Sequence, residues 1–541
     1  MSTREIVEQF LKKNYLVSPD VLSSVTNIDD FSFYEDKGEK PIVVTKDVFF
    51  VANKNKKPME INWLEFEKSR VLYEKGKDNK IYESFLEILS FDGSPQKKQI
   101  VEALINEIKQ QPEIIIEKEE ETPNVIITKC YVDESIKEKK VSDFVQYFKN
   151  RYNKMRDILM SREELQNSLS IKRILQKKDR DKVSLIGLIQ NKYVTKNGHV
   201  MLKLEDPTGL INVLINKEKG ETYSLAQNLV LDSAIGAVGV SNGEIVFANN
   251  IYLPDIPQTK ELKKSENESW VAFISDIHVG SKNFLEKEFL KFIKWLNLGL
   301  KENIEIASKL NYLIIAGDNV DGVGIYPGQD RDLAINDVRR QYDKLADYLS
   351  LIRKDIHIVI APGNHDAVRL TQPQPTLDKK YAESLFDIPQ LNLVTNPSVI
   401  TLHATRSFPG FDVLIFHGYS YHYYADNVES LRKIKARNHP KEIMKYMLQL
   451  RHLGPTHTST LYIPDTREDP LIIDRIPDIF VSGELHKPEV GSYNGVVTIG
   501  CSCWQSVTDY ELKMGNSPDP CKVVVMNLKT REIKILDFNE K

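Results

Sequence analysis

The sequence predicts an α+β protein of several domains: an amino-terminal helical module, a small β-barrel and a carboxy-terminal α/β domain with a two-layer sheet. The chain has 541 residues, more than one hydrophobic core usually holds. Its apolar periodicity changes from helical to alternating at Val183, and after the polar stretch from Pro254 it changes to buried strands between amphipathic helices. We therefore expect a helical module at 1–110, a linker with helices at 111–182, a barrel at 183–256 and the α/β domain at 257–541.

Composition narrows the class of protein. Hydrophobic residues make up 41% and charged residues 28%, as in soluble globular proteins. We find no apolar run of about 18 residues and no signal-peptide-like start, so we expect a cytoplasmic protein without membrane contact. Four scattered cysteines form neither a zinc motif nor a disulfide framework. The net charge of −4 means that any nucleic-acid contact must come from local basic patches, metal ions or a partner subunit.

Helix signals dominate the first part of the chain. Thr3 can cap a first helix, and Ser18-Pro19 supplies an N-cap followed by proline at the first helical position. Leu86 to Ile108 gives another amphipathic pattern. The charged run Glu117 to Pro123 is either a linker or a solvated helix end. A helical pattern resumes at Ser142.

Alternating apolar residues predict the barrel. Two such runs flank the turn sequence Asp206-Pro207-Thr208-Gly209, and Asn242-Gly243 is a typical hairpin turn between two later runs. About five short strands in this stretch favour an oligonucleotide-binding (OB) type barrel. The alternative is a spacer or docking domain, because a fold does not fix a function.

The third part alternates buried strands with helices. Amphipathic segments at Glu286–Leu300 and Asn336–Leu351 separate the first of these strands, which favours a sheet flanked by helices. The apolar runs are Val271–Ile274, Tyr312–Ala316, Ile356–Ala361, Val413–Phe416, Ile479–Ser482 and Val496–Ile499.

Polar side chains follow five of these strands directly. Loops at the carboxyl ends of strands in an α/β sheet meet in one crevice, so we expect these residues to lie together. Carboxylate and amide oxygens with imidazole nitrogens suit two divalent ions, with Mn²⁺ preferred and Fe²⁺, Zn²⁺ or Mg²⁺ as alternatives, and do not suit Ca²⁺. Two ions about 3.5–4 Å apart need a shared carboxylate. The residues are Asp276, His278, Asp318, Asn364, His365, Asp366, His417, Glu484 and His486.

This series resembles the calcineurin-like metallophosphoesterase superfamily, whose pattern is D-x-H, G-D-x-x-D, G-N-H-D, H and G-H-x-H. The resemblance implies that Asp276, His278 and His486 hold one metal ion. It implies that Asn364, His417 and Glu484 hold the other, and that Asp318 bridges the two. His365 would stabilise the transition state or protonate the leaving oxygen, and Asp366 would orient it through a hydrogen bond.

One position departs from that pattern, because Glu484 stands where the superfamily has histidine. A carboxylate can still bind manganese, so the second site is either retained with altered affinity or crippled.

A finer resemblance is to the small subunits of archaeal family D DNA polymerases, carried by residues 274–281, 318–329 and 362–369. It implies a proofreading subunit of a DNA-directed DNA polymerase, that is, a metal-dependent 3′–5′ exodeoxyribonuclease. It also implies a heterodimer with a large catalytic subunit that carries the nucleotidyltransferase site. The DNA substrate would be single-stranded or a primer 3′ end, and the sliding clamp would be reached through the complex.

Candidate DNA contacts are Arg369, Arg331, Tyr419 and Tyr421, from phosphate pairing or base stacking. Surface solvation of the arginines and packing of the tyrosines are the alternatives. Two other functions stay open: an accessory scaffold with a partly decayed metal site, supported by Glu484, and a free-standing phosphoesterase for small substrates. The barrel and the helical module argue against the second, since a small-molecule phosphatase needs neither.

Overall fold

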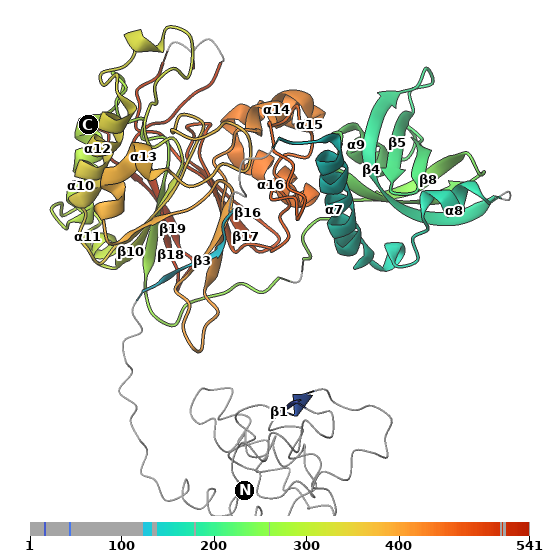
Figure 1. Cartoon of the computed structure of the whole chain (residues 1–541), viewed down its shortest axis with the longest axis horizontal. Coiled ribbons are helices and arrows are strands. Elements are labelled where there is room, and N and C mark those ends of the chain that lie inside the picture. The colour runs from blue at the N-terminus through green and yellow to red at the C-terminus, as the bar shows by residue number, and fades with distance from the viewer. Residues whose placement is uncertain are drawn as a thin grey trace, which may run out of the picture. The chain divides into compact units, whose positions relative to one another are not determined.

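The computed structural model describes residues 123–131, 138–177, 180–258, 260–508, 511 and 515–539. It also describes two short strands, β1 (Leu16–Val17) and β2 (Val43–Val44), which pair in parallel. The chain divides into two units, Met1–Glu121 and Thr122–Lys541. The helices predicted within 1–110 lie outside the described residues. The second unit holds the barrel and the α/β domain (Figure 1).

The second unit opens with a strand that the sequence did not predict. β3 (Val125–Lys129) lies in the stretch expected to be linker and helices, and it pairs antiparallel with a strand of the α/β domain. The helix predicted from Ser142 is α7 (Val141–Met160), which buries Met155 and Leu159. Two short helical segments follow it, η2 (Glu163–Leu165) and α8 (Ile171–Leu175).

Five strands form a closed barrel in the order β4-β5-β6-β8-β7. Alternate side chains such as Leu202, Leu204 and Val213 point into its core. At the first predicted turn, the Asp206 carboxylate accepts hydrogen bonds from the backbone amides of Thr208 and Gly209. The elements are β4 (Asp181–Val194), β5 (Val200–Asp206), β6 (Gly209–Ile215), α9 (Gly220–Gln227), β7 (Ala234–Ser241) and β8 (Ile245–Tyr252).

The α/β domain contains two six-stranded sheets. Strands β9, β10, β11 and β12 of the first sheet are parallel, and so are β14, β15 and β17 of the second. The first sheet runs β12 (Leu391–Leu393), β11 (His357–Ala361), β10 (Leu310–Ala316), β9 (Trp270–Ile274), β18 (Lys522–Asn527), β19 (Ile533–Asp537). The second runs β16 (Glu489–Tyr493), β17 (Val496–Gly500), β15 (Ile479–Ser482), β14 (Phe411–Ile415), β13 (Ser398–Leu402), β3.

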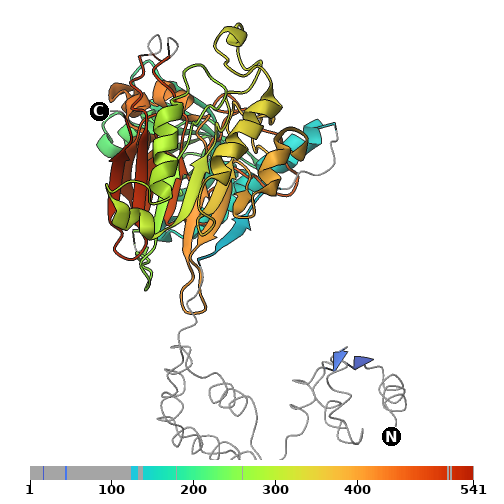
Figure 2. The same cartoon turned by 90° about the vertical axis from the view of Figure 1, so that its left-hand side faces the viewer.

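The two sheets pack face to face, and helices cover both outer faces (Figures 1 and 2). Apolar side chains such as Phe273 from β9 and Val413 from β14 share the core between the sheets. All six predicted strands are present, so the predicted α/β arrangement with a two-layer sheet is confirmed. Among the described helices, none combines the length and the apolar character needed to cross a membrane.

Helices α10 to α13 pack on the first sheet and α14 to α16 on the second. The predicted helix at Asn336 starts later because the Asp337 side chain caps it by accepting from the Arg340 amide. The elements are α10 (Glu286–Leu296), α11 (Ile304–Ser308), η3 (Gln329–Arg331), α12 (Val338–Ser350), α13 (Lys379–Ala382), η4 (Glu383–Asp387), α14 (Tyr421–Asn427), α15 (Glu429–Lys433), η5 (Ala436–Asn438) and α16 (Pro440–Leu450).

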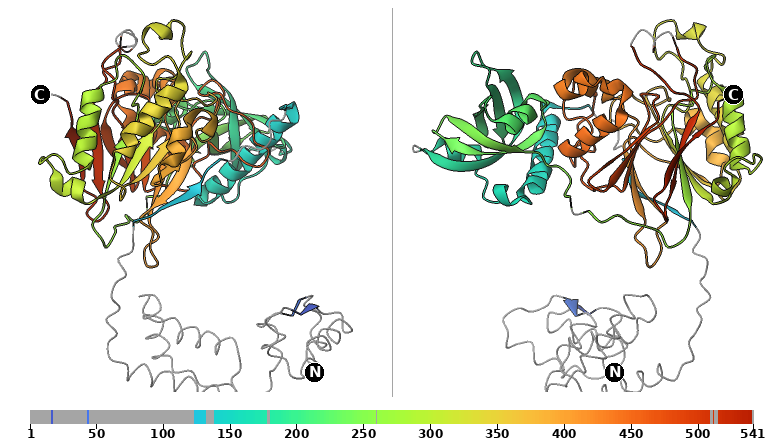
Figure 3. Two further views of the ribbon diagram at one scale, coloured as in Figure 1. Left: turned by 60° about the vertical axis from the view of Figure 1, so that its left-hand side comes forward. Right: turned by 180° about the vertical axis from the view of Figure 1, so that it is seen from behind.

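Helix α7 lies between the barrel and the α/β domain (Figure 3), and a buried arginine joins it to the α/β domain. Arg151 is fully buried, and its Nε lies 2.6 Å from the Asp469 carboxylate. The same carboxylate accepts from the Tyr147 hydroxyl at 2.7 Å and contacts His452 Nε2 at 2.9 Å. The charge of the buried Asp469 carboxylate is therefore balanced by Arg151, and its oxygens have two further buried partners.

Replacing Arg151 by alanine is expected to lower the free energy of unfolding by about 3–5 kcal/mol, because it removes the guanidinium that balances the buried Asp469 charge. Urea denaturation followed by circular dichroism measures the change. Lys154→Ala on the same helix is the matched control, since the Lys154 side chain is 52% exposed and lies 3.9 Å from Asp474. It should cost no more than about 1 kcal/mol. Equal losses in both variants would contradict the role given to Arg151.

Candidate metal centre

The predicted ligands come together where strand ends of both sheets meet. Asp276, Asp318 and Asn364 follow β9, β10 and β11 of the first sheet, while His417 and Glu484 follow β14 and β15 of the second. Because the strands within each set are parallel, their carboxyl ends share one edge. The cluster therefore joins residues more than 200 positions apart in the sequence.

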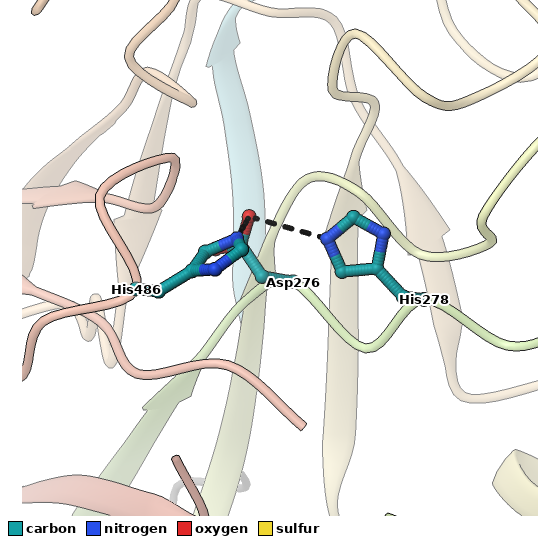
Figure 4. Close-up of side chains that lie close together, drawn as sticks. All are labelled: Asp276, His278 and His486. Atoms are coloured by element: carbon teal, nitrogen blue, oxygen red, sulfur yellow. Dashed lines mark ion pairs between the residues drawn. The ribbon is translucent and has the colours of Figure 1, made fainter. Parts of the chain in front are cut away.

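One group consists of Asp276, His278 and His486, whose ligand atoms lie within 4.8 Å of one another. Figure 4 shows both imidazole rings directed at the Asp276 carboxyl from different loops. The Asp276 Oδ1 atom lies 3.2 Å from His486 Nε2 and 3.9 Å from His278 Nε2. Asp276 is fully buried, so water does not screen this group.

A second group consists of Asp276, Asp318 and His417. The Asp318 Oδ2 atom lies 3.3 Å from His417 Nε2 and 3.9 Å from His278 Nε2. Asp276 belongs to both groups, and the Asp318 carboxylate faces one histidine of each.

Several ligand atoms of this cluster have no hydrogen-bond partner. They are Asp276 Oδ1, His278 Nε2, Asn364 Oδ1 and His417 Nε2, all buried. Buried polar atoms in folded proteins are nearly always paired, and an unpaired one is costly. Four such atoms on predicted ligands of mixed oxygen and nitrogen type fit the binding of divalent cations.

The other ring nitrogen of each histidine is held by a second group. His417 Nδ1 bonds to the Ala316 carbonyl at 2.7 Å, and His278 Nδ1 contacts the Asp321 carboxylate at 3.1 Å. His486 Nδ1 lies 3.4 Å from the Glu511 carboxylate. Each contact turns Nε2 toward the cluster, as is usual for metal-binding histidines. Sequence reasoning assigned no role to Asp321, although it lies in the G-D-x-x-D motif, and no signal pointed to Glu511.

The histidines of the cluster favour the charged form of the Asp318 carboxylate. Burial alone would raise the pKa of Asp318, but His417, His365 and His278 hold that pKa well below its ordinary range. Burial would likewise lower the pKa of His417, yet Asp318 and Glu484 raise it well above the usual value. The cluster therefore attracts positive charge, which either protons or metal ions supply.

The backbone at the cluster is strained. The φ angles of Asp276, His278, Asp318, Glu484 and His486 are 52°, 54°, 51°, 69° and 53°, in the left-handed region that side chains other than glycine avoid. Such residues cost about 1–3 kcal/mol each and gather at functional sites.

Two glycines let the ligand loops approach closely. A Cβ atom on Gly317 would lie 2.5 Å from His417 Nδ1, and one on Gly363 would lie 2.1 Å from Asp318 Oδ1. Both positions therefore exclude any side chain.

Comparison with known proteins identifies the family. Residues 271–491 match the family of B subunits of DNA polymerases alpha and epsilon. The DNA polymerase II small subunit of Methanothermobacter thermautotrophicus is 35% identical over 401 residues, which is 74% of this chain and 80% of that protein. The chain belongs to the family of archaeal DNA polymerase II small subunits. The small subunit of Pyrococcus horikoshii is 38% identical over 404 residues, 74% of this chain and 63% of that protein.

Solved structures are similar to parts of the chain. A novel archaeal phosphodiesterase is 12% identical with a TM-score of 0.25, covering 49% of this chain and 98% of that structure. Vacuolar protein sorting 29 from Cryptosporidium parvum is 14% identical with a TM-score of 0.25, covering 50% and 96%. The family membership confirms the resemblance to archaeal polymerase small subunits that the sequence motifs carry.

His365 lies beside the cluster. Its backbone amide donates to Asp318 Oδ1 at 2.9 Å, and its Nδ1 bonds to the Asp321 carbonyl at 2.8 Å. His365, His278 and Asp321 form a third group that could hold a metal ion. That group would use His278 Nδ1, which already faces Asp321, and it would leave His278 Nε2 unpaired. The first group is therefore the better site.

The predicted hydrogen bond from Asp366 to His365 is wrong. The Asp366 carboxylate accepts instead from the Tyr342 hydroxyl at 2.9 Å, the Asn319 side-chain amide at 2.9 Å and the Gly363 amide at 2.8 Å. These donors occupy both oxygens, so Asp366 fixes the loop that carries His365 rather than the ring itself.

The predicted stacking of Tyr421 on DNA is also wrong, because Tyr421 is fully buried in the core against Phe416. Tyr419 is half-buried and Arg331 is exposed. The half-buried Arg369 guanidinium donates to the Pro373 carbonyl from Nε at 3.1 Å and from Nη2 at 2.7 Å.

Glu484 has a partner that sequence reasoning missed. Its carboxylate lies 3.1 Å from His417 Nε2 and 3.0 Å from His422 Nε2. Although burial raises the pKa of Glu484, these two histidines hold it well below its ordinary range. The only sequence signal was a histidine five positions after His417 in a tyrosine-rich segment.

Proposed function

We propose that this chain is the proofreading subunit of an archaeal replicative DNA polymerase, a metal-dependent 3′–5′ exodeoxyribonuclease of calcineurin-like metallophosphoesterase type. The observation that carries the proposal is the set of unpaired ligand atoms on converging loops, Asp276 Oδ1, His278 Nε2, Asn364 Oδ1 and His417 Nε2. A chain used only as a scaffold would gain nothing from the cost of burying them.

The cluster provides ligands for two divalent ions. Asp276, His278 and His486 hold one, and Asn364, His417 and Glu484 hold the other, with Asp318 shared. The oxygen-rich donor set favours Mn²⁺, with Fe²⁺, Zn²⁺ and Mg²⁺ as alternatives. Bound there, the ions would lower the pKa of the attacking water and neutralise charge on the phosphate.

His365 supplies the remaining proton chemistry. Because its Nδ1 is engaged by the Asp321 carbonyl, Nε2 is the nitrogen left to exchange a proton with the departing 3′ oxygen. Asp321 thereby serves two histidines, through its carbonyl for His365 and through its carboxylate for His278. Among the candidate DNA contacts, Arg331 is exposed and is proposed to pair with a phosphate, while Arg369 and Tyr419 lie half-buried.

The barrel at 183–256 is assigned to the OB type, and 257–541 to the phosphoesterase domain. The strand order of the barrel is β4-β5-β6-β8-β7, and helix α9 precedes its fourth strand, β7. Both features support the assignment to the OB type. The helical module at 1–110 and the linker with helices at 111–182 complete the proposed organisation. A single-stranded DNA or primer 3′ end is the proposed substrate.

The partner is a large catalytic subunit, as the small-subunit name of the relatives implies, and the sliding clamp is reached through that complex. A second candidate function is an accessory scaffold without catalysis. It is favoured by Glu484, which stands where the superfamily pattern has a metal-binding histidine.

Exonuclease action predicts dependence on a free DNA end. The purified chain with Mn²⁺ should degrade a linear single-stranded oligonucleotide and leave a circular one of the same sequence intact, because only the linear form offers a 3′ terminus. Gel analysis of both substrates measures this. Cleavage of the circular oligonucleotide at a similar rate would show that the chain is an endonuclease and not an exonuclease.

A further inference from the structure

We propose that His422 is a positioning residue that holds Glu484 in place as a ligand of the second divalent cation. This inference rests on the proposed two-metal function and deepens it. It assigns a role to a residue outside the superfamily pattern, and it explains how the second site is kept although its expected histidine is a glutamate.

Each oxygen of the Glu484 carboxylate contacts a histidine. One oxygen lies 3.0 Å from His422 Nε2, and the other lies 3.1 Å from His417 Nε2. The Glu484 side chain is 10% exposed, so these contacts are shielded from water. His422 belongs to α14, which begins directly after the loop that carries His417. One segment of chain therefore supplies both neighbours of this carboxylate.

The backbone of Glu484 is fixed independently of its side chain. Its φ angle is 69°, and its amide donates to Asp276 Oδ2 at 3.2 Å. On the other side, a Cβ atom on Gly418 would lie 3.1 Å from the Cβ of Glu484. The only freedom left is the rotation of the Glu484 side chain, and the hydrogen bond to His422 removes it.

The chemistry of His417 indicates what the free carboxylate oxygen faces. Its Nδ1 bonds to the Ala316 carbonyl, which can only accept, so in the neutral ring Nε2 carries a lone pair. That lone pair faces Glu484 at 3.1 Å and Asp318 at 3.3 Å. Three electron-rich atoms at this spacing repel one another unless a proton or a metal ion lies among them.

The donor set has a consequence for the choice of metal. Oxygens of Asp318, Asn364 and Glu484 with one nitrogen of His417 make a harder site than a pair of histidines would. Harder donors suit Mn²⁺ and Mg²⁺ rather than Zn²⁺. Glu484→His should therefore shift the preference of this site toward Zn²⁺.

Calorimetric titration of the full chain with Mn²⁺ tests the inference. The parent should bind two ions. His422→Ala should weaken one of them by about 10–100-fold, the usual cost of losing a residue that orients a ligand, and leave the other unchanged. His422→Gln, whose amide can still donate to Glu484, should restore most of the affinity.

The decisive comparison is made in the Glu484→His background. There, His422→Ala should change Mn²⁺ affinity by less than about three-fold, because the carboxylate that His422 holds is gone. His439→Ala is the matched control, since it breaks another His–Glu pair, with His439 Nδ1 at 3.3 Å from Glu489. It should leave both sites unchanged.

The results of these titrations distinguish the role of His422 from the proposed two-metal function. Two bound ions whose affinities do not respond to His422→Ala overturn the inference and leave the two-metal site standing. Equal losses in the parent and Glu484→His backgrounds also overturn it, since His422 would then act on something other than Glu484. A parent chain that binds fewer than two ions contradicts the two-metal function, and the inference falls with it.

Discussion

Replacing His365 by alanine is expected to slow DNA cleavage by about 10²–10⁴-fold, the usual cost of losing a general acid. The ring is held by the 2.8 Å bond from Nδ1 to the Asp321 carbonyl, and it packs edge-on against His278 with ring centroids 4.7 Å apart. Its Nε2 is thereby directed without being needed as a ligand of either proposed ion. Single-turnover cleavage of a labelled oligonucleotide measures the loss.

Mn²⁺ binding by the His365→Ala variant distinguishes a role of His365 in proton transfer from a role as a metal ligand. His365→Ala should bind Mn²⁺ with the stoichiometry of the parent chain, because neither proposed ligand set includes His365. Cleavage at the parental rate would remove His365 from the mechanism. Loss of one bound ion would instead make it a ligand, in keeping with the third group formed by His278, Asp321 and His365.

Gly363→Ala is expected to lower the cleavage rate by about 10²-fold or more, because ligands displaced by about 1 Å lose this much. The added Cβ atom would lie 2.1 Å from Asp318 Oδ1 and 2.5 Å from the Asp318 amide nitrogen. Asp318 is the carboxylate shared by both proposed ions, so its displacement affects both. Cleavage and Mn²⁺ titration, read together, measure the effect.

The control for this variant is Gly209→Ala in the barrel, where the nearest atom to an added Cβ is Ile171 Cγ2 at an ordinary 3.5 Å. Circular dichroism of both variants checks the fold. If Gly363→Ala cleaves DNA and binds Mn²⁺ like Gly209→Ala, the close approach of the two loops is not needed for the site.

The α/β domain could be predicted because the sequence signals for its strands and ligand loops are local. Continuous apolar runs such as Ile479–Ser482 mark buried parallel strands, and the residues that follow them carry the ligand motifs. By contrast, β3 is a short strand with exposed Ile126 and Ile127, stabilised by pairing with β13 about 270 positions later. Propensity does not contain such a long-range contact.

The contacts within the site were harder to predict, because they also join segments that are distant in the sequence. The superfamily resemblance implied a hydrogen bond between Asp366 and His365, yet the donors to Asp366, Asn319 and Tyr342, come from other elements. Tyr421, which follows the loop of His417, was a candidate for stacking on DNA bases, with packing as the alternative. It opens α14 on the inward face, where a tyrosine packs with Phe416.

Exonuclease activity is tested by incubating a 5′-labelled single-stranded oligonucleotide with the purified chain and Mn²⁺, beside an Asp318→Asn control. A ladder that shortens from the 3′ end is expected with the parent chain, and an intact oligonucleotide with Asp318→Asn, because the carboxylate shared by the two proposed ions loses its charge. No cleavage by the folded parent, even with its large subunit present, would contradict the account and leave the chain as a scaffold.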